Sequence, residues 1–224
     1  METSKVADWD SASDKVARRL LPAERQQQIV EKAIEHFTRS GFGGSTRDLA
    51  RQIGITQPLL YRYFENKEAL IERVYNEVFQ WRPEWEQQIA DCSLPLIERL
   101  YAFYIDYSSV ILREEWIRLF IFSGLTHEGI NDRYMDMLRS KVFLPVLAEI
   151  REAFGIAAPR NAAENDAAIE MVWSLHAAIF YLGVRKWVYG LSVPDDMEAV
   201  IRQKVDIFLC GAPATLRKIQ GATI

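Results

Sequence analysis

The sequence STRDLARQIGITQPLLYRYF, residues 45–64, predicts two short helices joined by a sharp turn. Ser45 stands three residues before an aspartate, a capping pattern that begins a helix. Gly54 suits the positive φ angle of a sharp turn, and the Thr56 hydroxyl can cap the second helix. The apolar residues point inward from the two helices, which are expected around residues 45–53 and 57–64. This arrangement is a helix-turn-helix unit.

The outward side chains of this unit have the chemistry of a reader of DNA bases. Gln57 can form two hydrogen bonds to one base, usually adenine, and apolar neighbours suit a thymine methyl group. Hydroxyl groups and a free helix N-terminus can bind phosphate oxygens. The plainer alternative is a packed corner, with Tyr61 partly in the core. The predicted DNA-contacting residues are Ser45, Thr46, Arg47, Thr56, Gln57, Pro58, Leu59, Tyr61, Tyr63 and Lys67.

Charge is unevenly distributed along the chain. The formal net charge of −4 does not by itself favour a nucleic-acid partner. Residues 15–80, however, contain eleven Lys and Arg against eight Asp and Glu, whereas residues 81–224 contain fifteen against nineteen. The positive segment therefore coincides with the helix-turn-helix unit, where contacts to DNA phosphates would need it.

Residues from about Arg25 to Phe79 resemble the TetR family of bacterial transcriptional regulators. The resemblance rests on an amphipathic first helix, on Gly54-Ile55-Thr56, and on Leu60-Tyr61-Arg62-Tyr63-Phe64 followed by Lys67-Glu68-Ala69-Leu70. It implies that the chain binds double-stranded DNA at a palindromic operator. It also implies a homodimer and an all-helical effector domain that binds a small molecule.

Helical periodicity runs through nearly the whole chain, and no segment shows the alternation of a strand. The predicted fold is all-α, with a three-helix helix-turn-helix DNA-binding domain and a larger helical domain for effector binding and dimerisation. A first helix begins at Pro22 and stops at Gly41, and a later one begins near Lys67. Further helices are expected at residues 94–112, 114–126, 130–154, 164–189 and 195–210. The domains are a flexible extension over residues 1–21, the DNA-binding domain over 22–81 and the effector domain over 82–224.

The last two predicted helices are apolar on more than one face. A helix of this kind must be buried on two sides, one of which can meet a second subunit. A symmetric pairing of both helices would form a four-helix interface. A single larger monomeric core is the alternative. The predicted interface residues are Val172, Leu175, Ile179, Leu182, Val200, Ile201, Val205 and Phe208.

Aromatic residues are concentrated in the middle of the chain and could line a pocket for an apolar or aromatic ligand. Each of them could equally be ordinary core, and His176 could be a satisfied buried histidine. His36 is expected on the exposed side of the first helix. The candidate ligand contacts are Phe103, Tyr104, Tyr107, Trp116, Phe120, His127, Trp173, His176 and Phe180.

Several classes of function are disfavoured. The chain has no HExxH, Gly-rich phosphate loop or GxSxG elbow, so no enzyme, cofactor or metal site is expected. Cys92 and Cys210 lack CxxC spacing and are expected to be small buried residues. The N-terminus does not have a signal-peptide pattern, and apolar runs such as Leu175–Val184 are too short for a bilayer. We expect a bacterial cytoplasmic protein, associated with the nucleoid and without a membrane partner.

These features favour a transcriptional repressor that a small molecule releases from its operator. The ligand can act in this way only if it binds one state of the protein more tightly than the other. Two alternatives share the same features. The protein could activate transcription in response to a ligand, or it could bind small molecules and use the helix-turn-helix for protein contacts.

Overall fold

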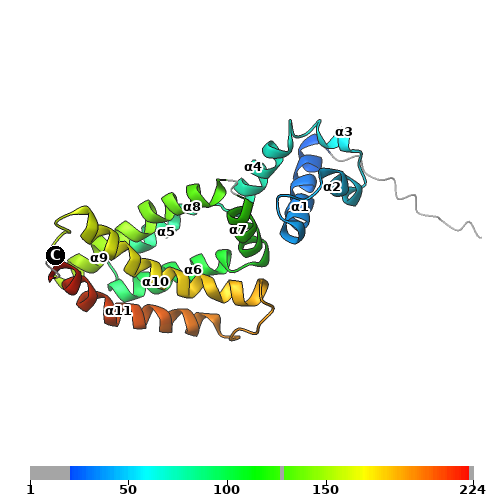
Figure 1. Ribbon diagram of the computed structural model, residues 1–224. Helices are drawn as coiled ribbons and strands as arrows, with labels where there is room; N and C mark the ends of the chain where they lie inside the picture. Colours follow the sequence, from blue (N-terminus) through cyan, green and yellow to red (C-terminus); the bar gives the residue numbers. More distant parts are fainter. Residues whose placement is uncertain (1–20, 127–128, 222–224) are drawn as a thin grey trace, which may run out of the picture.

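The computed structural model describes residues 21–126 and 129–221, and every regular element within these ranges is a helix (Figure 1). The all-α prediction is therefore confirmed. Most of the expected N-terminal extension and the candidate ligand residue His127 lie outside the described residues.

The N-terminal part contains four helices, and α1 to α3 are grouped at one end of the molecule (Figure 1). Their bounds are α1 Pro22–Ser40, α2 Thr46–Ile53, α3 Gln57–Leu60 and α4 Lys67–Val78. The first helix begins and ends where the sequence predicts, with Gly41 at a positive φ of 69°. The third is shorter than expected, because the backbone after Leu60 closes with i to i−3 hydrogen bonds rather than continuing as an α-helix.

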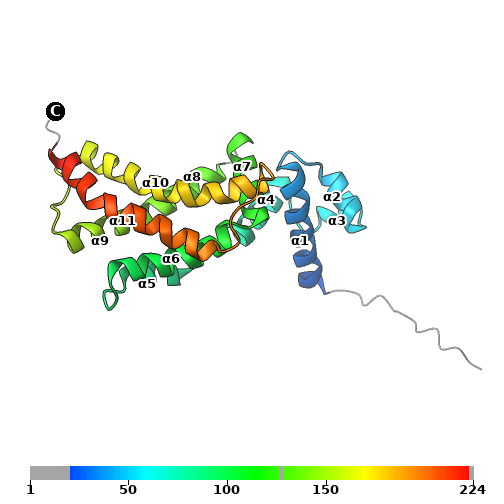
Figure 2. The same ribbon diagram turned by 90° about the horizontal axis from the view of Figure 1, so that it is seen from below.

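The C-terminal part begins at Pro83, which starts a new helix after a break at the end of α4. Figure 2 shows α10 and α11 running side by side, with α6 and α9 beside them. The helices are α5 Pro83–Ala90, α6 Leu96–Ile111, α7 Glu114–Thr126, α8 Ile130–Leu138, α9 Leu144–Phe154, α10 Ala162–Trp187 and α11 Met197–Gly221, with a π-helical segment η1 at Arg139–Phe143.

Two of these helices differ from the sequence prediction. The helix expected over residues 130–154 contains the π-helical segment η1, just before Pro145, a residue that cannot donate a backbone hydrogen bond. The last helix was expected to end at residue 210, yet α11 continues through Gly211 and Pro213 to Gly221. Pro213 is buried inside this helix, so tertiary packing outweighs its low helix propensity.

The helix α10 is long and apolar enough to cross a membrane when only length and composition are considered. The expectation that apolar runs such as Leu175–Val184 are too short for a bilayer was wrong, because this run is part of the 26-residue helix α10. Half of its most apolar window is buried inside the protein, where α10 packs against α6, α7, α9 and α11. The apolar residues of α10 therefore form part of the hydrophobic core of the C-terminal helices.

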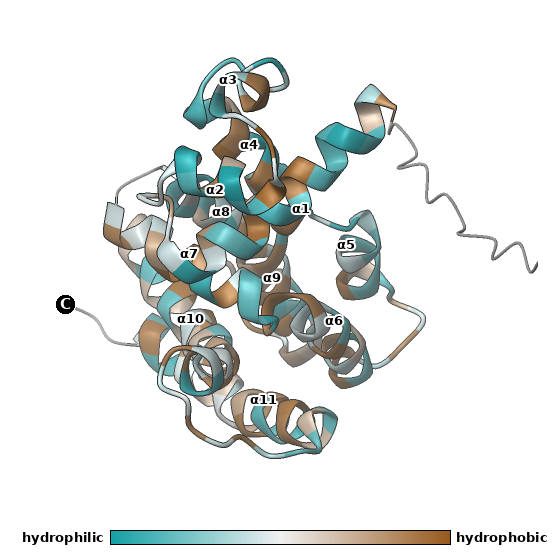
Figure 3. Cartoon of the chain, turned by 90° about the vertical axis from the view of Figure 1, so that its right-hand side faces the viewer, coloured by the Kyte–Doolittle hydropathy of each residue, from teal (hydrophilic) through white to brown (hydrophobic). Residues whose placement is uncertain are grey.

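A continuous hydrophobic core runs from α1 through α11. Figure 3 shows mainly hydrophilic residues on α2 and mainly hydrophobic residues on α6. Two expectations about single residues were wrong. His36 is buried beside Gly44, because its face of α1 packs inward. Cys92 and Cys210 are free and exposed, one in the turn before α6 and the other on the outer face of α11.

The N-terminal helices are joined to the C-terminal helices at two places. The end of α1 packs on α7, where Gly41 leaves space for the ring of Phe122. On the other side, Arg133 of α8 forms a bidentate pair with Glu72 of α4, at 3.0 and 2.8 Å. This pair lowers the pKa of the Glu72 carboxyl group. Movement of the helix-turn-helix relative to the C-terminal helices would therefore have to change packing at α7 or α8.

Candidate nucleic-acid interface and C-terminal pocket

The turn between α2 and α3 is fixed by local interactions that the sequence predicts. The Ser45 hydroxyl accepts a hydrogen bond from the backbone N–H of Asp48 at 3.3 Å, and the Thr56 hydroxyl accepts one from Leu59 at 3.3 Å. Gly54 has φ 75° and ψ 31°, in the left-handed region that favours glycine. These three residues set the angle at which α3 leaves α2.

Thr46 connects the two helices through side chains. Its hydroxyl oxygen accepts a hydrogen bond from Nε2 of Gln57 at 3.0 Å and lies 3.0 Å from the Tyr61 hydroxyl. Thr46 itself is only 8% exposed. The structure therefore places Thr46 behind Gln57 and Tyr61, as a support for both side chains.

The other predicted DNA-contacting residues differ in exposure. Ser45, Arg47, Thr56, Pro58 and Tyr61 are exposed, whereas Gln57, Leu59, Tyr63 and Lys67 are half-buried. Tyr63 also packs against the hydrophobic core. The unit thus brings most of these residues to one end of the molecule, on α2, α3 and the start of α4 (Figure 1).

Three cations at this end have no acid partner in residues 21–126 and 129–221. Arg47, Arg62 and Lys67 form no ion pair within the described residues, whereas Arg51 pairs with Asp48 at 3.2 Å. Unpaired cations can approach phosphate oxygens without first losing an internal partner. Arg62 is not among the predicted DNA-contacting residues, but it is exposed and forms no ion pair within the described residues.

The start of α4 is capped by a residue that the sequence reading did not single out. The Asn66 side chain accepts a hydrogen bond from the backbone N–H of Ala69 at 2.7 Å. The position of Asn66 directly before the Lys67-Glu68-Ala69 helix start is the pattern that identifies such a cap. Asn66 fixes the helix terminus that carries Lys67.

The candidate ligand residues of the C-terminal part form a packed aromatic core. Phe103 stacks on Tyr107 at 5.2 Å, and Trp116 stacks on Phe120 at 4.9 Å between ring centroids. Phe103, Tyr104, Tyr107, Trp116, Phe120 and His176 are buried, and Trp173 and Phe180 are half-buried. Burial raises the pKa of Tyr107, whose hydroxyl lies 2.8 Å from that of Tyr134, and lowers the pKa of His176 to about 4. Trp173 borders a pocket on the surface of α10, together with Glu170, Ser174 and Ala177.

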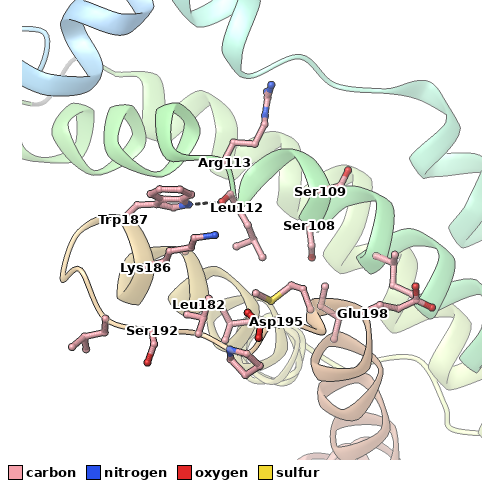
Figure 4. A pocket seen from close by; sticks show the side chains of 17 residues that line it. Ser108, Ser109, Leu112, Arg113, Leu182, Lys186, Trp187, Ser192, Asp195 and Glu198 are labelled. Atoms are coloured by element: carbon pink, nitrogen blue, oxygen red, sulfur yellow. Dashed lines mark hydrogen bonds between the residues drawn. The ribbon is translucent and has the colours of Figure 1, made fainter.

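A larger pocket lies elsewhere, between α6, α10, the following loop and the start of α11 (Figure 4). We name this site the α10–α11 pocket. Its volume is about 670 Å³, within the range of small-molecule sites. Its wall includes Leu112, Leu182, Trp187, Met197 and Ile201. The sequence did not reveal it, because most of its wall consists of residues at helix ends and in a loop.

The residues predicted for the dimer interface are placed inside the chain itself. Val172, Leu175, Ile179, Leu182, Ile201, Val205 and Phe208 are buried, and Val200 is half-buried. The seven buried residues are therefore not available to a second subunit in this arrangement. Both apolar faces of α10 meet the chain's own helices, a distinction that helical periodicity alone cannot make.

A different face of the same two helices is exposed. On α10 it carries Ser174, Ala177, Ala178 and Tyr181, spaced by three or four residues, and on α11 it carries Ile207, Cys210, Gly211 and Ala214. Ile207 is 68% exposed. We name this face the α10–α11 outer face.

Arg118 of α7 connects the N-terminal helices with the end of α10. Its Nε donates to the carbonyl oxygen of Thr38 at 2.7 Å, and its Nη1 donates to that of Trp187 at 3.1 Å. Both carbonyls belong to the last turn of a helix, where they lack intrahelical partners. One guanidinium therefore caps α1 and α10 at once, and Trp187 in turn lines the α10–α11 pocket.

Among the residues that the structure describes, no group of three or more His, Cys, Asp or Glu side chains is arranged to hold a metal ion. The described part of the chain thus combines a helix-turn-helix that carries cations without acid partners there with a separate helical part that contains a pocket. They define the class of helix-turn-helix proteins with a C-terminal helical domain.

Comparison with known proteins narrows this class. Residues 29–74 match the family described as bacterial regulatory proteins, tetR family. The N-terminal part of the chain therefore carries the DNA-binding domain that is typical of the TetR family. This is a family of transcriptional regulators rather than enzymes.

Two curated relatives match part of the chain. The HTH-type transcriptional repressor KstR2 of Mycolicibacterium smegmatis is 31% identical over 85 residues, which cover 38% of this chain and 42% of that protein. The HTH-type transcriptional regulator LuxR of Vibrio harveyi is 36% identical over 70 residues, or 31% of this chain and 34% of that protein. The match thus spans less than half the length of either relative.

Solved structures share the fold over most of the chain. A TetR-like transcriptional regulator from Rhodococcus sp. RHA1 has a TM-score of 0.64 at 18% identity and covers 86% of this chain and 100% of its own. A putative TetR-family transcriptional regulator from Mesorhizobium loti has a TM-score of 0.54 at 18% identity and covers 86% and 98%. At this identity the likeness concerns the fold alone, and it includes the C-terminal helices.

Proposed function

We propose that this protein is a dimeric, sequence-specific DNA-binding repressor that a small molecule releases from its operator. The observation that carries the proposal is the helix-turn-helix end, where Gln57 is held by Thr46 while Arg47, Arg62 and Lys67 have no acid partner among the residues that the structure describes. The repressor function named for KstR2 supports repression over activation. A bacterial cytoplasmic location follows from this role.

On DNA, α3 lies in the major groove, which an α-helix can enter. Gln57 reads a base, and Pro58 and Leu59 face a neighbouring apolar edge. Arg47 reaches a base edge or a phosphate. The phosphate backbone is held by Ser45, Thr56, Tyr61, Arg62, Tyr63 and Lys67. These contacts set the register of the protein on the DNA. Thr46 acts indirectly by positioning Gln57 and Tyr61.

The dimer forms through the α10–α11 outer face. Its small residues, such as Ala178 and Gly211, allow two helix pairs to approach closely, and exposed Ile207 and Tyr181 supply apolar area that water would otherwise cover. Two-fold pairing there would build a four-helix interface. It would also present two α3 segments to half-sites of a palindrome, about 34 Å apart.

Release of DNA requires that the ligand change the position of the helix-turn-helix. Arg118 provides a physical route, because it holds both the last turn of α1 and the carbonyl of Trp187 at the α10–α11 pocket. A ligand that displaces Trp187 would disturb this cap and alter the seating of α1 on α7. We place the boundary between the DNA-binding domain, residues 22–81, and the effector domain, residues 82–224, just after α4.

The test is selection of bound sequences from random duplex DNA with the full-length protein, followed by competition against random duplex at moderate salt. We expect a palindromic site bound at least a thousandfold more tightly than random duplex, as is usual for specific binding. Binding that shows no preference for any duplex would overturn the proposal. Weak binding that salt does not change would instead favour a helix-turn-helix used for protein contacts.

A further inference from the structure

The α10–α11 pocket has a rigid apolar wall on the side of α6 and α10. Nε1 of Trp187 donates to the carbonyl oxygen of Leu112 at 2.7 Å, which fixes the indole across the end of α6 (Figure 4). Leu182, Met197 and Ile201 complete the apolar lining. An apolar group bound there would displace water from a surface that already has its final shape.

Two of the charged residues that line the pocket already have partners. Arg113 pairs with Glu115 at 3.3 Å and donates from Nε to the carbonyl of Val110 at 3.1 Å. Glu198 pairs with Arg202 at 2.9 Å. Both charges are therefore already partly neutralised by a neighbouring group of opposite sign.

Lys186 is the cation that remains. It forms no ion pair within the described part of the chain, and its ammonium lies 4.5 Å from the centre of the Trp187 ring. Figure 4 shows the ammonium directed from α10 into the pocket, next to Leu112. Asp195, which forms no ion pair within the described part of the chain, also lines the pocket, in the segment just before α11 (Figure 4).

A buried hydroxyl group completes the polar lining. Ser108 is 2% exposed, and its Oγ has no hydrogen-bond partner in the structure. Figure 4 shows this hydroxyl pointing from α6 toward the pocket. Buried polar groups are usually paired, so an unpaired one that faces a pocket indicates a place for a ligand oxygen.

We propose that the α10–α11 pocket binds a small amphipathic carboxylate, with its apolar body against Trp187 and Leu112, its carboxylate at Lys186 and an oxygen at Ser108. Only one part of this inference rests on the proposed function, namely that the bound ligand is the effector. The order of binding expected for one apolar chain with different head groups is carboxylate first, then alcohol, then ammonium, because Lys186 attracts the first and repels the last.

The experiment is calorimetric titration of the full-length protein with decanoate, 1-decanol and decylammonium, all below the concentrations at which they aggregate. Lys186→Met keeps the aliphatic stem and removes the charge, and Lys141→Met is the matched control, since Lys141 pairs with Glu86 outside the pocket. We expect Lys186→Met to weaken decanoate about fivefold, as for a partly exposed ion pair. Decanol binding should stay unchanged in both variants.

The site of binding is read independently from methyl NMR of labelled methionines. Decanoate should shift the methyl resonance of Met197, assigned through Met197→Leu, and leave that of Met135 on α8 in place. Three results would each overturn the proposal. They are equal binding of decanoate to the wild type and to Lys186→Met, tighter binding of decylammonium than of decanoate, and a Met197 methyl resonance that decanoate does not shift. None of these titrations contains DNA. Failure to bind an operator therefore refutes the proposed function separately, and decanoate that binds without releasing DNA refutes only its role as effector.

Discussion

Nε2 of Gln57, the first residue of α3, donates a 3.0 Å hydrogen bond to the hydroxyl of Thr46, the first residue of α2. The side chain proposed to read a base is therefore positioned before DNA arrives. Its amide oxygen and second N–H remain for the base. Preorganisation of this kind reduces the conformational entropy lost on binding.

Gln57→Ala should weaken specific binding by roughly 1–3 kcal/mol and relax the base preference at one position in each half-site. Thr46→Val removes only the supporting hydroxyl, so it should weaken binding by about 1 kcal/mol, the value of one hydrogen bond, while the preferred base stays the same. The measurement is quantitative competition among operators that differ at single positions. A uniform loss on all sequences for Gln57→Ala would exclude a reading role.

Lys67→Ala should weaken binding to every duplex about equally. Its ammonium sits at the start of α4 without an internal acid partner within the described chain, as expected for a phosphate contact. Loss of one phosphate contact should flatten the slope of log affinity against log salt by about 1. Lys141→Ala, which lies in the C-terminal part, should leave that slope as it is. A slope unchanged by Lys67→Ala would remove this residue from the interface.

Ile207→Glu should convert the dimer into a monomer without unfolding it. The side chain is 68% exposed, so the single chain loses little when it is replaced, whereas a symmetric interface would bury two carboxylates. Sedimentation measures the association state, and circular dichroism checks the fold. Leu125→Glu changes a side chain that is 73% exposed on α7 and should leave the dimer intact. A dimer that persists in Ile207→Glu would place the interface elsewhere.

Arg118→Met should loosen the last turns of both α1 and α10. It removes the donors to Thr38 and Trp187 while it retains an unbranched stem, and we expect a loss of about 1–3 kcal/mol in the free energy of unfolding. Hydrogen exchange should accelerate at the ends of these two helices together. Faster exchange at only one of them would show that Arg118 does not link them. Arg139→Met, which removes an exposed pair with Asp166, is the control.

Stability should fall as the pH decreases below about 6.5. Burial lowers the pKa of His176 to about 4 from 6.5, so the unfolded chain takes up a proton at this residue before the folded chain does. Above pH 6.5 the imidazole is mostly neutral in both the folded and the unfolded chain, so the full free energy of unfolding is present. As the pH falls to 4, protonation of the unfolded chain at this residue lowers the free energy of unfolding by about 3 kcal/mol. Urea unfolding at several pH values measures this loss, and His176→Phe should reduce it. An identical pH dependence in that variant would assign the effect to other groups.

The parts of the structure that depend on local sequence could be predicted, and those that depend on tertiary packing could not. The caps at Ser45 and Thr56 and the left-handed Gly54 are set by residues within a few positions of one another. Helix periodicity likewise located most helices. By contrast, it could not tell whether an apolar face such as that of Leu175 meets its own chain or a partner. The end of α11 beyond Pro213 also depends on burial against distant helices.

The pocket was missed for a related reason. The aromatic residues that composition favours as a ligand site, such as Tyr107 and Trp116, are packed against one another. The open space is instead bordered by helix ends and by the loop after α10, where residues such as Ser192 and Pro194 carry no periodic signal. A sequence pattern identifies apolar faces, but it does not show where packing between them is incomplete.

The position of Trp187 has a practical consequence. Within the described ranges the tryptophans are at positions 81, 85, 116, 173 and 187, so the helix-turn-helix unit itself contains none. Trp81 is the last residue of the proposed DNA-binding domain, the other four belong to the proposed effector domain, and of these five indoles Trp187 is the one that lines the α10–α11 pocket. In a Trp9→Phe background, any emission change caused by operator DNA would have to reach an indole outside the helix-turn-helix unit, through α4 or through the contacts at α7 and α8. The intrinsic fluorescence of the unlabelled protein would therefore report communication between the DNA-binding end and the rest of the chain.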